Sequence, residues 1–189
     1  MPEGAVRHQT LTVQEYLELE GASSLRHEYV AGVMYVLAGA SKRHNRIALN
    51  IAGRLTRAAG DGPCRVYMSD VKLRADEDVY YYPDVMVACG PEGEDPLVED
   101  APCLVVEILS PSTAVIDRRE KLVAYKRIPT LEAYLIVEQA ERRVQRHWRD
   151  EQGVWWDAEV SGQGQVPLPC PEVTLTLDDI YAGLDPPEG

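Results

Sequence analysis

The chain has few cysteines, the residues that form disulfides and bind zinc. It contains four cysteines, Cys64, Cys89, Cys103 and Cys170, which lie far apart and form no CxxC pair. Two of them fall inside apolar segments, as expected of small buried side chains. We therefore expect free thiols of a reducing compartment, and neither zinc ligands nor disulfide partners.

Long apolar runs are also missing. No stretch approaches the roughly eighteen apolar residues that a bilayer-spanning helix needs. The first thirty residues show no basic segment followed by an apolar one, which is the pattern of a secretory signal. The sequence thus predicts a soluble cytoplasmic protein that has no membrane partner.

Basic residues are outnumbered, with 19 Lys and Arg against 31 Asp and Glu, a net charge of −12. Generic binding to a phosphate backbone relies on a positive surface, so this balance argues against it. The basic residues gather, however, in two predicted elements: Lys42, Arg43, Arg46, Arg54 and Arg57, then Arg142, Arg143, Arg146 and Arg149. A local basic groove and ordinary solvated faces are both compatible with this pattern.

The length of 189 residues, with 45% hydrophobic and 26% charged residues, is typical of one globular domain. We expect a single domain over residues 1–189, with a core at about 10–140 and C-terminal strands and a surface extension at 141–189. Helices are predicted at about 12–19, 41–59 and 114–127 from capping residues and apolar spacing. Strands are predicted at 27–30, 33–37, 65–74, 80–89, 103–109, 133–138, 142–149 and 154–160.

A glutamate lies in the middle of the most apolar stretch, Cys103-Leu104-Val105-Val106-Glu107-Ile108-Leu109. Such a short run predicts a strand covered on both faces. An ionised carboxylate is costly there unless a cation or hydrogen-bond donors meet it. Glu107 is therefore expected to have a dedicated partner, either a metal ion or protein donors.

A second carboxylate opens another apolar strand. Asp84 follows Pro83 and precedes Val85-Met86-Val87-Ala88, and proline is tolerated where a strand begins. Asp84 and Glu107 could then converge from neighbouring strands. Oxygen ligands of this kind suit Mg²⁺ or Mn²⁺, and a hard cation on one or two carboxylates is common where phosphodiesters are cleaved.

The predicted helix after Glu107 carries Asp117, Lys121 and Tyr125, which are four residues apart and share a face. That helix connects two strands that are expected to be parallel neighbours. If the face turns toward the Glu107 strand, Lys121 could orient water or neutralise charge that grows on a phosphorane-like transition state. Alternatively, Lys121 forms only a surface helix pair with Asp117.

Together these residues resemble the bacterial Uma-type restriction endonuclease family, part of the restriction-endonuclease-like superfamily with the PD-(D/E)xK signature. The resemblance rests on Pro83-Asp84, on Glu107 followed by Ser110-Pro111-Ser112-Thr113, and on Lys121 in the next helix. It implies an α/β (α+β) fold with a mixed sheet flanked by helices. It also implies Mg²⁺ or Mn²⁺ held by Asp84 and Glu107, and DNA as substrate. By the same resemblance Glu28 is a further site carboxylate, with a polar strand residue as the alternative. The fold class favours a homodimer, because cutting both strands commonly uses two sites.

One position departs from the superfamily signature, because Leu109 stands where the lysine of ExK is expected. Within the resemblance, Lys121 takes over as the basic group. Two other functions stay open: a catalytically silent nuclease-like module for dimerisation or partner binding, and a glycosidase that uses the two carboxylates as acid and base. The glycosidase is disfavoured because no sugar-stacking aromatic residue can be placed beside the pair.

Overall fold

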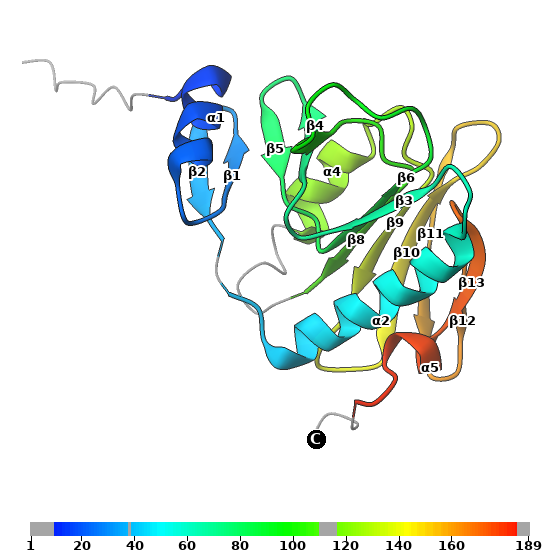
Figure 1. Cartoon of the computed structure of the whole chain (residues 1–189). Coiled ribbons are helices and arrows are strands. Elements are labelled where there is room, and N and C mark those ends of the chain that lie inside the picture. Colours follow the sequence, from blue (N-terminus) through cyan, green and yellow to red (C-terminus); the bar gives the residue numbers. More distant parts are fainter. Residues whose placement is uncertain (1–9, 38, 110–116, 185–189) are drawn as a thin grey trace, which may run out of the picture.

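The computed structural model describes residues 10–37, 39–109 and 117–184, which form a six-stranded sheet, a five-stranded sheet and a two-stranded hairpin, packed with helices (Figure 1). The central six-stranded sheet has the order β11-β10-β9-β8-β6-β3. Strands β8 and β9 are parallel, and every other neighbouring pair in this sheet is antiparallel. The bounds are β3 Arg65–Met68, β6 Val85–Ala88, β8 Leu104–Ile108, β9 Ala133–Val137, β10 Arg143–Arg149 and β11 Trp155–Ser161. The predicted mixed sheet flanked by helices is thus confirmed.

Helix α2 (Lys42–Ala59) covers one face of this sheet. Its fully buried side chains, Ile47, Ile51 and Leu55, follow helical spacing and pack with alternate residues of β6 and β8. The helix begins where predicted, because the Ser41 hydroxyl accepts a hydrogen bond from the His44 N–H at 3.0 Å. This packing fixes the first turn of α2 beside the ends of the central strands.

The opposite face is covered by a π-helical turn, η1 (Asp117–Lys121), which continues into α4 (Leu122–Tyr125). Along the chain these elements come after β8 and before β9. Because β8 and β9 are parallel neighbours, the elements form the predicted crossover connection. The first residues of the predicted helix, 114–116, and the Ser110-Pro111-Ser112-Thr113 motif lie outside the described residues. The crossover places its last turns directly behind Glu107.

A second sheet has the order β2-β1-β5-β4-β7, and helix α1 (Val13–Ala22) packs on it. Its strands are β1 His27–Val30, β2 Val33–Val36, β4 Lys72–Asp76, β5 Val79–Tyr81 and β7 Val98–Glu99. On α1, Tyr16 stacks on Tyr29 of β1 with ring centroids 4.7 Å apart. The N-terminal helix and hairpin were both predicted from the sequence, and both are confirmed.

The two long strands predicted at 65–74 and 80–89 are each broken in the structure. The first is interrupted between β3 and β4, where Ser69 adopts a φ of 51°. The second is interrupted at Tyr82-Pro83, since proline has no N–H for a sheet ladder. The halves of each segment join different sheets, so both interruptions lie where the sheets meet. Asp84 follows one of them directly.

The segment predicted to be a surface extension is instead part of the core. It forms the hairpin β12 (Gln165–Pro169) and β13 (Glu172–Thr176), followed by α5 (Leu177–Ile180). Val166, Leu168 and Leu175 pack in the same buried cluster as α2. Their alternation with polar residues is a strand pattern, which the many glycines and prolines of this segment conceal in the sequence.

The cysteine prediction is also corrected. The structure joins Cys64 to Cys89 and Cys103 to Cys170 as disulfides. In the β3–β6 register Arg65 faces Ala88, which puts Cys64 opposite Cys89, although 25 positions separate them in the sequence.

No helix among the described residues is long and apolar enough to span a bilayer.

The position of the C-terminal hairpin can be tested by stability. Leu175, 1% exposed, packs against the α2 cluster, whereas its neighbour Thr174 faces solvent. We expect Leu175→Ala to lower the free energy of unfolding by about 2–5 kcal/mol, because it removes buried apolar contacts and leaves a cavity. Thr174→Ala should change it by less than about 0.5 kcal/mol in the same urea titration. Equal small effects would contradict the packing described here.

Candidate metal centre

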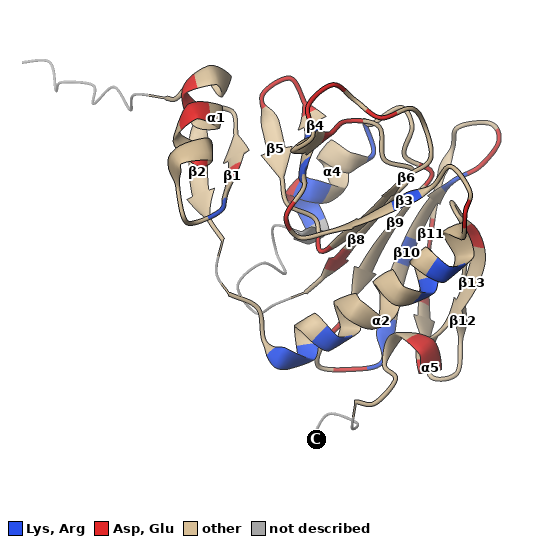
Figure 2. Ribbon diagram, viewed as in Figure 1, with Lys and Arg blue, Asp and Glu red and all other residues tan. Residues whose placement is uncertain are grey.

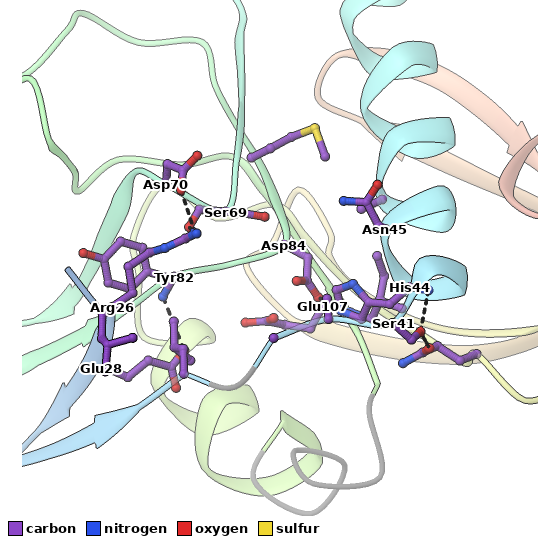
Figure 3. A pocket seen from close by; sticks show the side chains of 18 of the residues that line it. Arg26, Glu28, Ser41, His44, Asn45, Ser69, Asp70, Tyr82, Asp84 and Glu107 are labelled. Carbon is purple, nitrogen blue, oxygen red and sulfur yellow. Dashed lines mark hydrogen bonds and ion pairs between the residues drawn. The ribbon is translucent and has the colours of Figure 1, made fainter.

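A pocket of about 840 Å³ opens where the two sheets meet the first turn of α2 (Figure 3). Its lining includes Glu28 from the second sheet, His44 from α2, Asp84 and Glu107 from the central sheet, and Lys121 from η1. All four site residues predicted from the sequence therefore line one pocket. Three carboxylates, one imidazole and one ammonium group come together there from distant parts of the chain.

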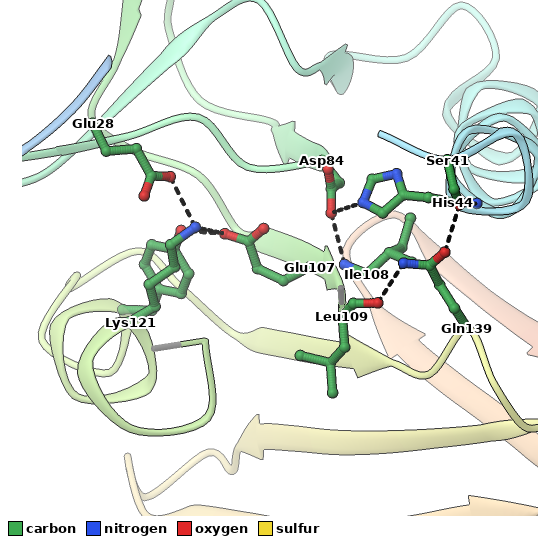
Figure 4. Close-up of polar contacts among 10 residues, drawn as sticks. Glu28, Ser41, His44, Asp84, Glu107, Ile108, Leu109, Lys121 and Gln139 are labelled. Carbon is green, nitrogen blue, oxygen red and sulfur yellow. Dashed lines mark hydrogen bonds and ion pairs between the residues drawn. The ribbon is translucent and has the colours of Figure 1, made fainter. Parts of the chain in front are cut away.

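Asp84 is held at the start of β6 by two contacts. Its Oδ2 accepts a hydrogen bond from the Ile108 N–H at 2.7 Å, and the same oxygen lies 3.1 Å from His44 Nε2 (Figure 4). In the β6–β8 register Val85 faces Val106, so one step further Asp84 lies beside Glu107. The two residues therefore lie side by side at neighbouring strand ends, as predicted.

Glu107 is 4% exposed, and protein groups hold its carboxylate. Its Oε1 accepts a hydrogen bond from the Tyr125 hydroxyl at 2.7 Å and lies 3.1 Å from Lys121 Nζ. Burial raises the pKa of Tyr125 well above its usual value, so its phenol stays protonated and can donate. The dedicated partner expected for Glu107 therefore includes a lysine and a tyrosine of the following helix.

Lys121 lies between two carboxylates. Its Nζ is 2.8 Å from Glu28 Oε1 and 3.1 Å from Glu107 Oε1, and the residue is only 4% exposed. The ammonium also lies 5.2 Å from the centroid of the Tyr81 ring. The helix face thus turns toward the Glu107 strand, as the first of the two sequence hypotheses required. The side chain of Asp117, needed for the competing helix pair, lies outside the described residues.

Glu28 brings the second sheet into the site. It is buried in β1, and its Oε1 accepts a weak hydrogen bond from the Tyr82 N–H at 3.3 Å as well as the Lys121 contact. Because Tyr82 lies where the 80–89 segment is interrupted, this bond ties β1 to the chain that leads into Asp84. Glu28 therefore positions Lys121 from the side opposite Glu107.

Two residues contribute more than the sequence indicated. A histidine near a helix start is more often a surface residue, yet His44 is 9% exposed and contacts Asp84. Its spacing from Ile47, Ala48 and Ile51 puts it on the buried face of α2, which is the signal that could have shown this. Gln139 had no sequence signal: its amide donates to the Leu109 carbonyl at 2.5 Å and accepts from the Ser41 hydroxyl at 2.7 Å.

The donor chemistry fits a hard divalent cation with several water ligands. Asp84 and Glu107 offer carboxylate oxygens to a polar pocket that is open to solvent, and Mg²⁺ commonly uses one or two carboxylates plus water. Within residues 10–37, 39–109 and 117–184, no three Asp, Glu or His ligand atoms at this pocket lie within 4.8 Å of one another. The residues thus suit a water-rich site and do not form a closed protein cage.

The arrangement of a mixed sheet flanked by helices is similar to that of a solved structure. The structure titled "putative nuclease belonging to DUF820" from Anabaena variabilis superposes with a TM-score of 0.75 at 17% identity. The match covers 91% of this chain and 98% of that one. At this identity the similarity establishes the fold alone.

Sequence comparison gives the family. Residues 13–178 match the Uma2 family model, described as "Putative restriction endonuclease", and the chain belongs to this family. Two uncharacterised Synechocystis proteins are similar over most of their lengths. The protein slr1290 is 31% identical over 92% of this chain and 93% of its own, and sll1609 is 34% identical over 81% and 89%. The family resemblance seen in the sequence is therefore confirmed.

The buried lysine gives a prediction about stability. Lys121→Met should lower the free energy of unfolding by about 3–5 kcal/mol, since it leaves Glu28 and Glu107 buried without their shared cation. Lys42→Met, at an exposed position of α2, should cost less than about 0.5 kcal/mol. Urea unfolding of both variants measures the difference, and a neutral Lys121→Met would show that the ion pairs do not hold the site together.

Proposed function

We propose that this protein is a metal-dependent DNA endonuclease that hydrolyses phosphodiester bonds with Mg²⁺ or Mn²⁺. The observation that carries the proposal is the pair of strand-end carboxylates, Asp84 and Glu107, in one pocket with a buried lysine. Membership of a family described as restriction endonucleases supports the same reaction class. The nuclease-type fold is consistent with it.

Asp84 and Glu107 would hold the ion, which when bound activates water and polarises the scissile phosphate. The chain orients Asp84 through the Ile108 N–H, which fixes one carboxylate oxygen at 2.7 Å. His44, 3.1 Å from the same oxygen, restrains Asp84 from the α2 side. Both contacts come from rigid elements, so the carboxylate is positioned before any ligand arrives.

Lys121 supplies the positive group that the signature expects two residues after Glu107. Leu109 at that place is buried in the apolar cluster behind the sheet and contributes no charge. Lys121 reaches the Glu107 carboxylate from η1 instead, and Glu28 anchors its ammonium from the other side. An ammonium held in this way can stabilise negative charge that develops on the phosphate oxygens.

Basic residues at the entrance of the pocket bear on the objection raised by the net charge of −12. The first turns of α2 carry basic residues, drawn blue in Figure 2, and the N-terminal end of this helix borders the pocket. Lys42 and Arg46 are exposed there, and Arg26 lines the opposite rim. A DNA strand entering the pocket would meet these positive groups at its entrance, although Arg26 is paired with the exposed Asp70 at 2.6 Å and carboxylates line the pocket floor. A homodimer with two such sites, expected for cutting both strands, stays a prediction.

Plasmid nicking tests the proposal directly. The protein should convert supercoiled plasmid to open circles with Mn²⁺, and chelator should stop the reaction. Asp84→Asn and Glu107→Gln should each reduce the rate by about 1,000-fold or more, because several kcal/mol of metal-derived transition-state stabilisation is lost. Asp157→Asn, an equivalent change at an exposed position of β11, should leave the rate unchanged.

Calorimetric titration with Mn²⁺ separates this function from its alternative. Intact plasmid at high protein concentration, together with no heat of Mn²⁺ binding, would favour a catalytically silent module for dimerisation or partner binding. If Lys121→Met folds, it should still bind Mn²⁺ but lose most of its cutting rate. Full activity in that variant would remove Lys121 from the catalytic machinery.

A further inference from the structure

All four cysteines lie together at the end of the central sheet that is remote from Asp84 and Glu107. Cys64 precedes β3, Cys89 follows β6 and Cys103 precedes β8. Because these neighbouring strands are antiparallel, the three cysteines lie at the same end of the sheet. Cys170 reaches the same place from the turn between β12 and β13. Four chain segments thus meet through sulfur atoms outside the proposed nuclease site.

The sulfur atoms form one cluster and not two separate pairs. Cys89, which is joined to Cys64, has its Sγ 3.5 Å from Cys103 Sγ and 3.2 Å from Cys170 Sγ. The sulfurs of Cys64, Cys89 and Cys170 all lie within 4.8 Å of one another. Cys89 is therefore in contact with every other cysteine of the chain.

Three of the sulfurs, those of Cys64, Cys89 and Cys170, lie within the span of a zinc tetrathiolate, and Cys103 adjoins them through Cys89. With Zn–S bonds of about 2.3 Å in a tetrahedron, neighbouring sulfurs lie about 3.8 Å apart. The contacts between the two cysteine pairs, at 3.2 and 3.5 Å, are close to that edge length. Once both disulfides are reduced, side-chain movements, the largest of them at Cys103, would place four thiolates around one ion.

The surroundings also favour a charged thiolate group. Four thiolates with Zn²⁺ carry a net charge of −2, and the guanidinium of Arg65 lies next to the cluster. It donates to the Pro63 carbonyl at 3.1 Å and to the Gly90 carbonyl at 2.8 Å, the residues that flank Cys64 and Cys89. Arg65 also pairs with the exposed Glu92 at 3.3 Å. Cys103 and Cys170 are buried, which limits solvent competition for the sulfurs.

We infer that the chain with reduced thiols binds one Zn²⁺ through Cys64, Cys89, Cys103 and Cys170, and that this ion fastens the C-terminal hairpin to the central sheet. From the disulfide form, each S–S bond first takes two electrons and two protons from a thiol or phosphine reductant, which is itself oxidised. Each resulting thiol then gives its proton to solvent as the metal binds. The ion would be structural, since four protein ligands leave no open position for substrate. The inference does not depend on nuclease activity.

Metal analysis of the full chain, purified with a phosphine reductant and without chelator, tests this inference. We expect one zinc per chain and, after exchange with Co²⁺, the intense thiolate-to-cobalt absorption of a tetrahedral site. Cys64→Ser/Cys89→Ser should lose both signals. Asp84→Asn/Glu107→Gln should retain them, which distinguishes this ion from one at the carboxylate pocket.

A single cysteine substitution that leaves the protein folded tests zinc binding separately from folding. Cys170→Ser alone, with circular dichroism to confirm the fold, should lose the tetrathiolate spectrum and melt at a lower temperature than the zinc-loaded parent. Two outcomes would overturn the inference: no zinc with four thiols that react freely with a thiol reagent, or no zinc with two disulfides that persist under reductant. Zinc retained by the double cysteine variant would overturn it as well.

Discussion

The contact on which the site depends is the buried ammonium of Lys121 between the carboxylates of Glu28 and Glu107. Each partner comes from a different layer: the second sheet, the crossover helix and the central sheet. Burying these charges separately would be very unfavourable, so their mutual pairing is what allows the two sheets to meet around a polar pocket. The π-helical turn η1, a form often found at functional sites, brings Lys121 to that junction.

The elements that follow a strong local pattern were predictable from the sequence. Thr12 and Ser41 cap their helices as expected, and Glu107 lies in a strand with all of its residues buried. The convergence of Asp84 and Glu107 was predicted from two continuous apolar runs, and the place of Lys121 from the spacing of its helix face. Glu28 was included through the family resemblance alone. Apolar patterns are informative here because burial on two faces leaves few alternatives for a strand of this composition.

Features that depend on contacts between residues far apart in the sequence could not be predicted from it. The positive φ at Ser69 and the interruption at Tyr82-Pro83 each divide a segment that looks continuous, and the halves of each segment join different sheets. The C-terminal hairpin is buried by α2, which no local signal shows. The cysteine cluster is a register effect between β3 and β6, invisible when the chain is read linearly. Gln139 gains its role only from the neighbours that folding provides, whereas the helical spacing of His44 from the buried residues of α2 was a usable signal.

The protein thus has a polar pocket at one end of its central sheet and a sulfur cluster at the other, with the apolar layers between them giving both a rigid frame. The most direct test of the central claim is a crystal of the protein soaked in Mn²⁺ and measured at the manganese absorption edge. The account predicts an anomalous peak within coordination distance of both Asp84 and Glu107, with waters completing the shell. A crystal that shows no peak there, or a peak bound only by residues outside this pocket, would contradict it.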